Sequence, residues 1–119
     1  MGQTELIASA PSADSTQLYV ELWVSLASLL RSYTAAHGLN GKLQATVELG
    51  EQRIVVRHGD NWLTLERNGA HVQWSRENGS VGTMDFNEHG RLNSEAGEEE
   101  MDMAAERWAR ELMMGERQQ

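Results

Sequence analysis

Residues 54–74 decide the fold, and they read IVVRHGDNWLTLERNGAHVQW. Apolar and polar residues alternate along this stretch with a period close to two, which is typical of half-buried β-strands. The alternating runs are separated by His58-Gly59-Asp60-Asn61 and by Asn68-Gly69. Asn-Gly between two such runs is a strong hairpin signal, because both residues tolerate positive φ. The stretch therefore predicts consecutive antiparallel hairpins.

The same pattern continues on both sides of this stretch. Before it, apolar residues alternate with polar ones from Leu43 to Leu49, and after it Met84-Asp85-Phe86 follows a second Asn-Gly pair at residues 78–79. A tight turn at residues 87–90 predicts a short edge strand through Leu92. We expect an antiparallel meander of four to six strands.

A long helix is predicted before the sheet, from about Ser15 to His37, where the apolar period changes to 3.6. Its main stripe consists of Leu18, Leu22, Leu26, Leu29, Leu30 and Tyr33, and it is widened by Tyr19, Val20, Trp23, Val24 and Ala27. An apolar band this broad must be covered by more than one neighbouring element, such as the sheet together with a second helix or a second subunit. Gly38 is predicted to end the helix in the left-handed conformation.

A second helix is predicted after the sheet, from about Glu98 to Met114. Its apolar face consists of Met101, Ala104, Ala105, Trp108, Leu112 and Met113. Residues 93–97 form a linker in this interpretation, with Ser94 as a possible cap. Glu98, Glu99 and Glu100 then stand at the helix N-terminus, where carboxylates interact favourably with the helix dipole.

These elements predict an α+β two-layer sandwich, in which an N-terminal and a C-terminal helix pack on one face of the meander. Residues 1–14 are expected to form a flexible arm, residues 15–115 a single domain and residues 116–119 a frayed tail. Trp23, Trp74 and Trp108 are expected to share one core. The order of elements is similar to that of frataxins and of several unrelated small α+β families, and it assigns none of them. A frataxin-like metal role would need an acidic ridge on the first helix, which carries only Glu21.

Charge and composition exclude several function classes. The chain has 119 residues, with 18 acidic residues against 10 basic ones and a net charge of −8, which repels nucleic acids and anionic membranes. It has no cysteine, so disulfides and thiolate metal sites are impossible. The opening residues lack the regions of a signal peptide, and the apolar stretch at residues 18–30 is too short to span a membrane. We expect a cytoplasmic protein that binds neither nucleic acid nor membrane.

No motif with catalytic or metal-binding chemistry stands out. Residues 85–92 have the ligand order of a calcium loop at their start, but position five is His89 and position twelve is Ala96 instead of a glutamate. The four histidines lack metal-ligand spacing, and the chain has no nucleophile elbow and no glycine-rich phosphate loop. We therefore expect a plain hairpin at residues 85–92. We also expect no catalytic residue, no cofactor and no metal, and a protein that is not an enzyme.

Candidate partner-binding residues come from three features of the sequence. They are Val20 and Val24 on one flank of the first helix, the acidic residues Glu98, Glu99, Glu100 and Asp102, and the methionines Met103 and Met114. The acidic run is either a docking face for a basic partner or a solvated helix start. Methionine suits adaptable contact surfaces, and an exposed apolar flank suits a homodimer. A monomer whose second helix covers the flank is the competing arrangement.

The sequence thus favours a small acidic protein-binding module, such as an adaptor, a chaperone-like protein or a regulatory subunit, that associates with itself. Small acidic α+β chaperones of secretion systems are similar in size and charge. The alternative is a small-ligand or metal-binding protein with a pocket between sheet and helices.

Overall fold

The computed structural model describes the backbone of residues 3–39 and 41–114, and the side chains from residue 16 onward within those ranges. In chain order the elements are α1 (Gln3–His37), β1 (Thr46–Leu49), β2 (Arg53–His58), β3 (Asn61–Asn68), β4 (His71–Arg76), β5 (Val81–Phe86), β6 (Arg91–Ser94), β7 (Gly97–Glu100) and α2 (Met101–Met114). The predicted α+β fold is confirmed. The described sheet has seven strands, one more than the upper limit predicted.

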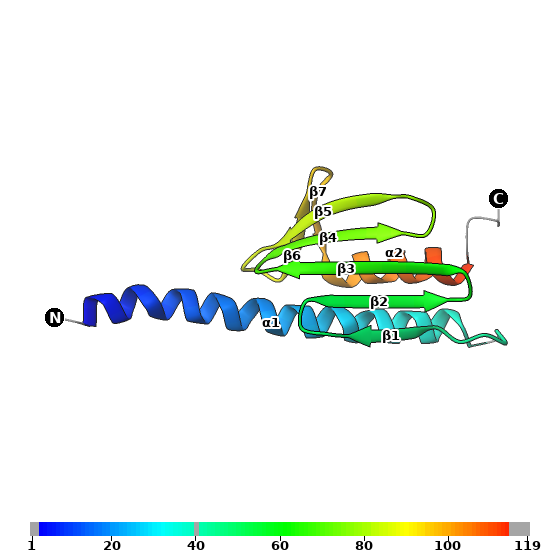
Figure 1. Ribbon diagram of the computed structural model, residues 1–119, viewed down its shortest axis with the longest axis horizontal. Coiled ribbons are helices and arrows are strands. Elements are labelled where there is room, and N and C mark those ends of the chain that lie inside the picture. Colours follow the sequence, from blue (N-terminus) through cyan, green and yellow to red (C-terminus); the bar gives the residue numbers. More distant parts are fainter. Residues whose placement is uncertain (1–2, 40, 115–119) are drawn as a thin grey trace.

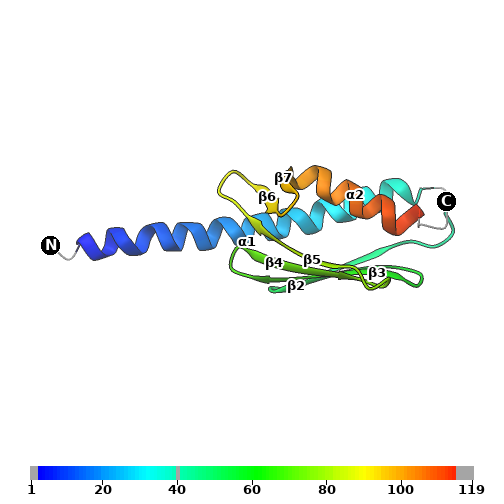
Figure 2. The ribbon, with the colours of Figure 1, turned by 90° about the horizontal axis from the view of Figure 1, so that it is seen from above.

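The sheet is a pure meander, in which each strand pairs with the next in antiparallel register. Figure 1 shows β1 to β5 side by side in chain order, with α1 and α2 behind them. In Figure 2 both helices lie on one face of β2–β5, and the β6–β7 hairpin bends out of that sheet towards α2. The molecule therefore has two layers, and the β6–β7 hairpin covers one side of the space between them.

The β2–β3 and β3–β4 hairpins each have a glycine at the first position of the turn. His58 pairs with Asn61 and Asn68 pairs with His71, so each connection contains two residues, of which the first is a glycine with φ of 64°. Glycine at the first central position is the signature of a type II′ turn, whose twist matches that of the strands. The hairpin predicted at Asn68-Gly69 is confirmed, with Asn68 as the last residue of β3 and Gly69 as the residue with positive φ.

One hydrophobic core fills the space between the layers, and it includes the three tryptophans that were expected there. Trp23 and Trp108 are buried, and Trp74 packs against this core at its margin. The rings of Trp74 and Trp108 meet edge to face, with centroids 6.1 Å apart and an interplanar angle of 65°. The shared core that the sequence predicted for these residues is thus confirmed.

The start of α2 differs from the prediction. Residues 97–100 form β7, which pairs with β6, and the helix begins only at Met101. Gly97, with φ of 118°, takes the positive φ that the tight turn after Ser94 requires, and the Ser94 hydroxyl accepts a hydrogen bond from the backbone N–H of Ala96. The linker and the helix cap predicted at residues 93–97 are therefore a strand and a hairpin turn.

The ends of α1 also differ from the prediction. The helix begins at Gln3, so residues 3–14 of the predicted arm are helical and project beyond the sheet (Figure 1). Pro11 removes one backbone hydrogen bond, but the alanines and glutamate around it favour a helix. The mobility of this segment stays a prediction, and the predicted tail at residues 116–119 lies outside the described residues.

Gly38 follows the last residue of α1 but does not adopt positive φ. A Cβ atom at this position would lie 2.8 Å from Cε of Met113. The end of the Met113 side chain thus packs closely against Gly38, and the predicted role of Gly38 as a left-handed cap was wrong.

A buried arginine ties the sheet to α2. The Arg76 side chain is only 3% exposed, and its guanidinium lies 3.1 Å from carboxylate oxygens of both Glu77 and Glu111. It also donates a hydrogen bond to the carbonyl oxygen of Trp62. Burial raises the pKa of the Glu77 carboxyl, but the hydrogen bonds from the Trp62 backbone and Arg76, with the charge of Arg76, outweigh it and lower the pKa overall.

Candidate functional site

Exposed apolar side chains gather along the edge of the molecule where α1 lies beside β1. The large hydrophobic residues exposed there are Val20, Val24, Leu39 and Leu49. Single exposed hydrophobic residues are normal on a protein surface, whereas a contiguous group marks a contact site. This edge is therefore the first candidate for function.

A groove lies at the end of this edge near the β1–β2 turn. We call it the flank groove; it has a volume of about 620 Å³ and is lined by Val20, Trp23, Val24, Leu49, Gly50, Glu51, Gln52 and Arg67. The Val24 side chain is 45% exposed on its wall. Trp23 donates a hydrogen bond from its indole nitrogen to the Gly50 carbonyl oxygen at 2.9 Å, so the helix wall and the turn are held together.

Arg67 supports the same groove. Its guanidinium carbon lies 5.7 Å from the ring centroid of Trp23, in cation–π geometry. Two of its nitrogens donate to the carbonyl oxygens of Glu51 and Gly69, while its buried Nε has no hydrogen-bond partner among the described residues. The guanidinium of the half-buried Arg67 thus stacks on the indole face, and Trp23 and Arg67 hold each other in place.

A second groove lies at the opposite end of the same edge. We call it the end groove; it has a volume of about 440 Å³ and is lined by Arg31, Thr34, Ala35, Gly38, Leu39, Gly41, Gln44, Ala45 and Val47. Most of these side chains are small, so the groove is a depression beside the helix end. Leu39 stands at its rim with 81% of its surface exposed.

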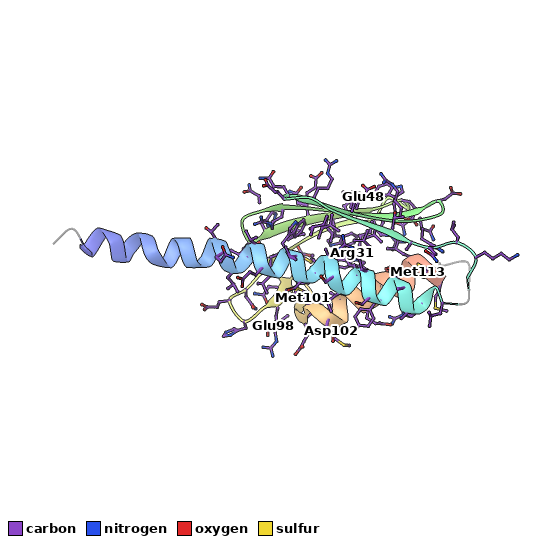
Figure 3. The ribbon with its side chains drawn as sticks, turned by 90° about the horizontal axis from the view of Figure 1, so that it is seen from below. Arg31, Glu48, Glu98, Met101, Asp102 and Met113 are labelled. Carbon is purple, nitrogen blue, oxygen red and sulfur yellow. The ribbon has the colours of Figure 1, made fainter. Side chains whose placement is uncertain are left out.

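The strand between the two grooves is an edge of the sheet. Gly50 donates its N–H to the Arg53 carbonyl oxygen, so the alternation of an antiparallel ladder points the backbone groups of Val47 and Leu49 away from β2. The Arg31 guanidinium donates to the outward carbonyl oxygen of Val47 at 3.3 Å. Figure 3 shows Arg31 on the side of α1 that faces the sheet. We call the flank groove, the β1 edge and the end groove together the flank surface.

Of the predicted partner-binding residues, Val20 and Val24 lie on the flank surface. Ala27, predicted on the same flank, is fully buried. The competing arrangement, in which α2 covers this flank, is not observed. Tyr33 and His37 contact Asp102 and Glu106, so α2 runs parallel to α1 along its opposite side.

Each of the predicted acidic residues has a partner within the chain. Glu98 accepts a hydrogen bond from the Asn87 amide at 2.7 Å, and Glu99 lies 2.8 Å from the Arg107 guanidinium. Glu100 faces Arg91, and Asp102 accepts a hydrogen bond from the Tyr33 hydroxyl at 2.5 Å. That hydrogen bond raises the pKa of Tyr33. Most of this acidity is thus engaged within the chain, and Figure 3 shows Glu98 and Asp102 on the side of α1 away from Glu48.

The predicted methionines lie on a third surface. Met103 and Met114 are exposed on α2, about three helical turns apart, and the ion pair between Glu106 and Arg110 lies between them along the helix. They form no patch with each other or with Val24. Sequence reasoning missed Leu39 and Leu49, whose only signal was apolar character just after the helix and at the end of a short strand.

A third groove, which we call the split groove, opens between β5, the β6–β7 hairpin and α2. Its volume is about 420 Å³, and its lining includes Trp74, Gly82, Thr83, Arg107 and Trp108. It exists because β6 pairs with β5 only at residues 85 and 86, so the start of β5 has no neighbour on that side. A Cβ atom at Gly82 would lie 2.6 Å from the Trp74 ring, so glycine is required there.

The described residues contain no group of three or more histidines, aspartates or glutamates that could hold a metal ion. At residues 85–92 the predicted hairpin is present, and the Asn87 side-chain oxygen accepts hydrogen bonds from the N–H groups of His89 and Arg91. Asp85 instead contacts His71 across the sheet. Neither helix in the described part of the chain combines the length and the apolar character that a membrane span needs.

The flank surface is thus apolar along most of its length and bordered by backbone groups that face away from the sheet. Its chemistry suits contact with another polypeptide better than a chemical reaction, because it brings no nucleophile and base together. The chain matches no family model, no curated protein and no solved structure.

Proposed function

We propose that the protein is a protein-binding module without catalytic activity, and that the flank surface is where it meets its partner. The observation that carries this proposal is the contiguous exposure of Val20, Val24 and Leu49 around one groove. The removal of apolar surface from water in such a groove contributes favourably to the free energy of protein association. The pair formed by Trp23 and Arg67 keeps the groove open without a partner, which lowers the entropic cost of binding.

The net charge of −8 limits the kind of partner. A partner of strongly negative charge would be repelled at long range, so the surface that it presents to the module must be low in acidic residues. An adaptor, chaperone-like or regulatory role is consistent with a small rigid domain that offers one apolar edge.

The test is capture of partners from the cell that makes the protein, with the wild type and two matched variants. Val24→Glu places a charge in the flank groove and should abolish capture. Val81→Glu makes the same substitution at a side chain that is 72% exposed outside the flank surface, and should leave capture unchanged. Partners that persist on Val24→Glu with an intact circular dichroism spectrum would contradict the proposal.

A second candidate function, a small-ligand site, is supported by the split groove. The edge-to-face pair of Trp74 and Trp108 forms an aromatic floor of this groove. Titration with an anilinonaphthalene sulfonate dye, which emits in apolar sites, tests it. Saturable binding that is lost in Thr83→Arg and kept in Val24→Glu would support this candidate, and no saturable binding to the wild type would exclude it for apolar ligands of this kind.

A further inference from the structure

We infer that the flank surface binds a second copy of this chain across a two-fold axis, with β1 paired to β1 of the second copy and Val24 seated in the end groove of the second copy. The inference rests on the proposed function and names the partner. It follows from the self-complementary layout of the surface, in which the exposed Val24 lies at one end and the end groove, lined mostly by small residues, lies at the other.

The positions of Val24 and Gly38 along α1 fit a two-fold axis that passes beside Val47. The hydrogen bond from Arg31 to Val47 places Arg31 level with the second residue of β1. Val24 lies seven residues before Arg31, and Gly38 lies seven residues after it, about 10 Å to either side at the helical rise of 1.5 Å per residue. An axis that relates two β1 strands at Val47 therefore also places Val24 opposite Gly38 of the second copy.

Charge and spacing together select the register of the strands. The outward backbone groups of Val47 and Leu49 permit three registers, in which Val47 pairs with Val47, Val47 with Leu49, or Leu49 with Leu49. Pairing of Val47 with Leu49 places Glu48 directly opposite Glu48 of the second copy, and like charges in that position are destabilising. Pairing of Leu49 with Leu49 moves the axis two residues along β1, away from the level of Arg31 at which Val24 lies opposite Gly38. Pairing of Val47 with Val47 places Glu48 opposite Thr46 instead, so we assign this register.

The charge of the surface also fits a second copy. Two chains of net charge −8 repel each other, so a shared interface must be low in acidic residues. The surface carries few acidic residues: Glu51 lines the flank groove at its turn end, and Glu48, on β1, lies 3.6 Å from the Arg57 guanidinium, which offsets part of its charge. An extended peptide from another protein would pair with β1 equally well, but it would leave the match between Val24 and the end groove unexplained.

Besides the net charge, Arg31 opposes assembly. A charged residue over an edge carbonyl is a common way to protect a sheet edge, and two Arg31 side chains would meet near the axis. The carbonyl oxygen of Val47 has two lone pairs, so it can accept the N–H of the second copy while Arg31 remains. Arg31→Gln should therefore tighten the dimer several-fold.

Sedimentation equilibrium of the full chain at tens of micromolar tests the inference first. We expect a reversible dimer, with twice the mass of one chain. Val24→Lys and Leu39→Glu should each weaken dimerisation by about tenfold or more, since each leaves an unpaired charge in a desolvated contact. An equimolar mixture of the two variants should restore a heterodimer, because the introduced lysine then faces the introduced glutamate at one contact while the other contact keeps the native pair.

Engineered cysteines test the register, and the chain has none of its own. A mixture of Thr46→Cys and Glu48→Cys chains should form a disulfide-linked dimer under mild oxidation, because non-hydrogen-bonded antiparallel pairs have Cα atoms about 4.5 Å apart, within disulfide range. Glu48→Cys alone should link much less. Efficient linking of Glu48→Cys alone would overturn the assigned register.

A monomer mass for the wild type at these concentrations would overturn the inference, and so would a dimer that tolerates both charge variants. Neither result would decide the proposed function, since capture of other partners is measured separately with Val24→Glu. Circular dichroism and melting of each variant show whether a lost dimer reflects lost folding, and restoration by mixing requires two folded chains.

Discussion

Trp108→Ala is expected to destabilise the protein by about 3–5 kcal/mol, the usual cost of truncating a large buried aromatic residue. Trp108 is 2% exposed in the core, and its ring packs edge to face on Trp74. The Arg107 guanidinium carbon lies 5.3 Å from the centroid of the same ring. The truncation therefore removes a cation–π contact and an aromatic pair together with the buried apolar surface.

Urea unfolding measured by far-ultraviolet circular dichroism gives the change in free energy. Trp62→Ala is the matched control, because the same side chain is removed from the open face of the sheet, where it is exposed. The control should cost less than half as much as Trp108→Ala. Equal losses in the two variants, or a Trp108→Ala protein as stable as the wild type, would show that the core is not organised around Trp108.

Arg76→Met is expected to cost about 3 kcal/mol at neutral pH, near the lower end of the cost of removing one partner from a buried ion pair. The substitution keeps much of the side-chain volume but leaves the mostly buried Glu77 carboxylate without its cation. Arg110→Met is the control, since its pair with Glu106 is half exposed and such pairs contribute about 0–1 kcal/mol.

The cost of Arg76→Met should depend on pH. In the wild type the pKa of folded Glu77 lies below its ordinary value of 4.5, so the unfolded chain takes up the proton first as the pH falls. The stability that Glu77 contributes is therefore present above pH 4.5 and is lost below it. The difference between wild type and variant should be largest near neutral pH and shrink under acid; a difference that grows under acid would contradict this account of the pair.

Much of the fold follows from local sequence. The alternation along residues 54–74 and the glycines of their turns specify the hairpins, because side-chain period and positive φ are properties of a few adjacent residues. The stripes of α1 and α2 likewise predicted which faces are buried, and with them the shared core of Trp23, Trp74 and Trp108. These features need no knowledge of distant contacts.

The boundary between β7 and α2 depended on tertiary structure. Three consecutive glutamates before an amphipathic stripe have the pattern of a helix start, and helix propensity favours that interpretation. The side chains that hold β7 in the sheet are Asn87, Arg91 and Arg107, which lie on the neighbouring hairpin and on α2. These partners lie 8 to 11 residues from the glutamates in sequence, beyond the three- and four-residue spacings of a helix, so helix propensity and periodicity alone predicted the wrong element.

Only part of the flank surface could be predicted from the sequence. The width of the apolar band on α1 predicted that some of it would remain uncovered, and Val20 and Val24 are the residues left exposed. The burial of Ala27 and the alignment of Leu49, Arg31 and Leu39 along the same edge depend on where the sheet ends beside the helix. Periodicity specifies which residues share a face of a helix, but only packing against distant segments decides which part of that face remains open to a partner.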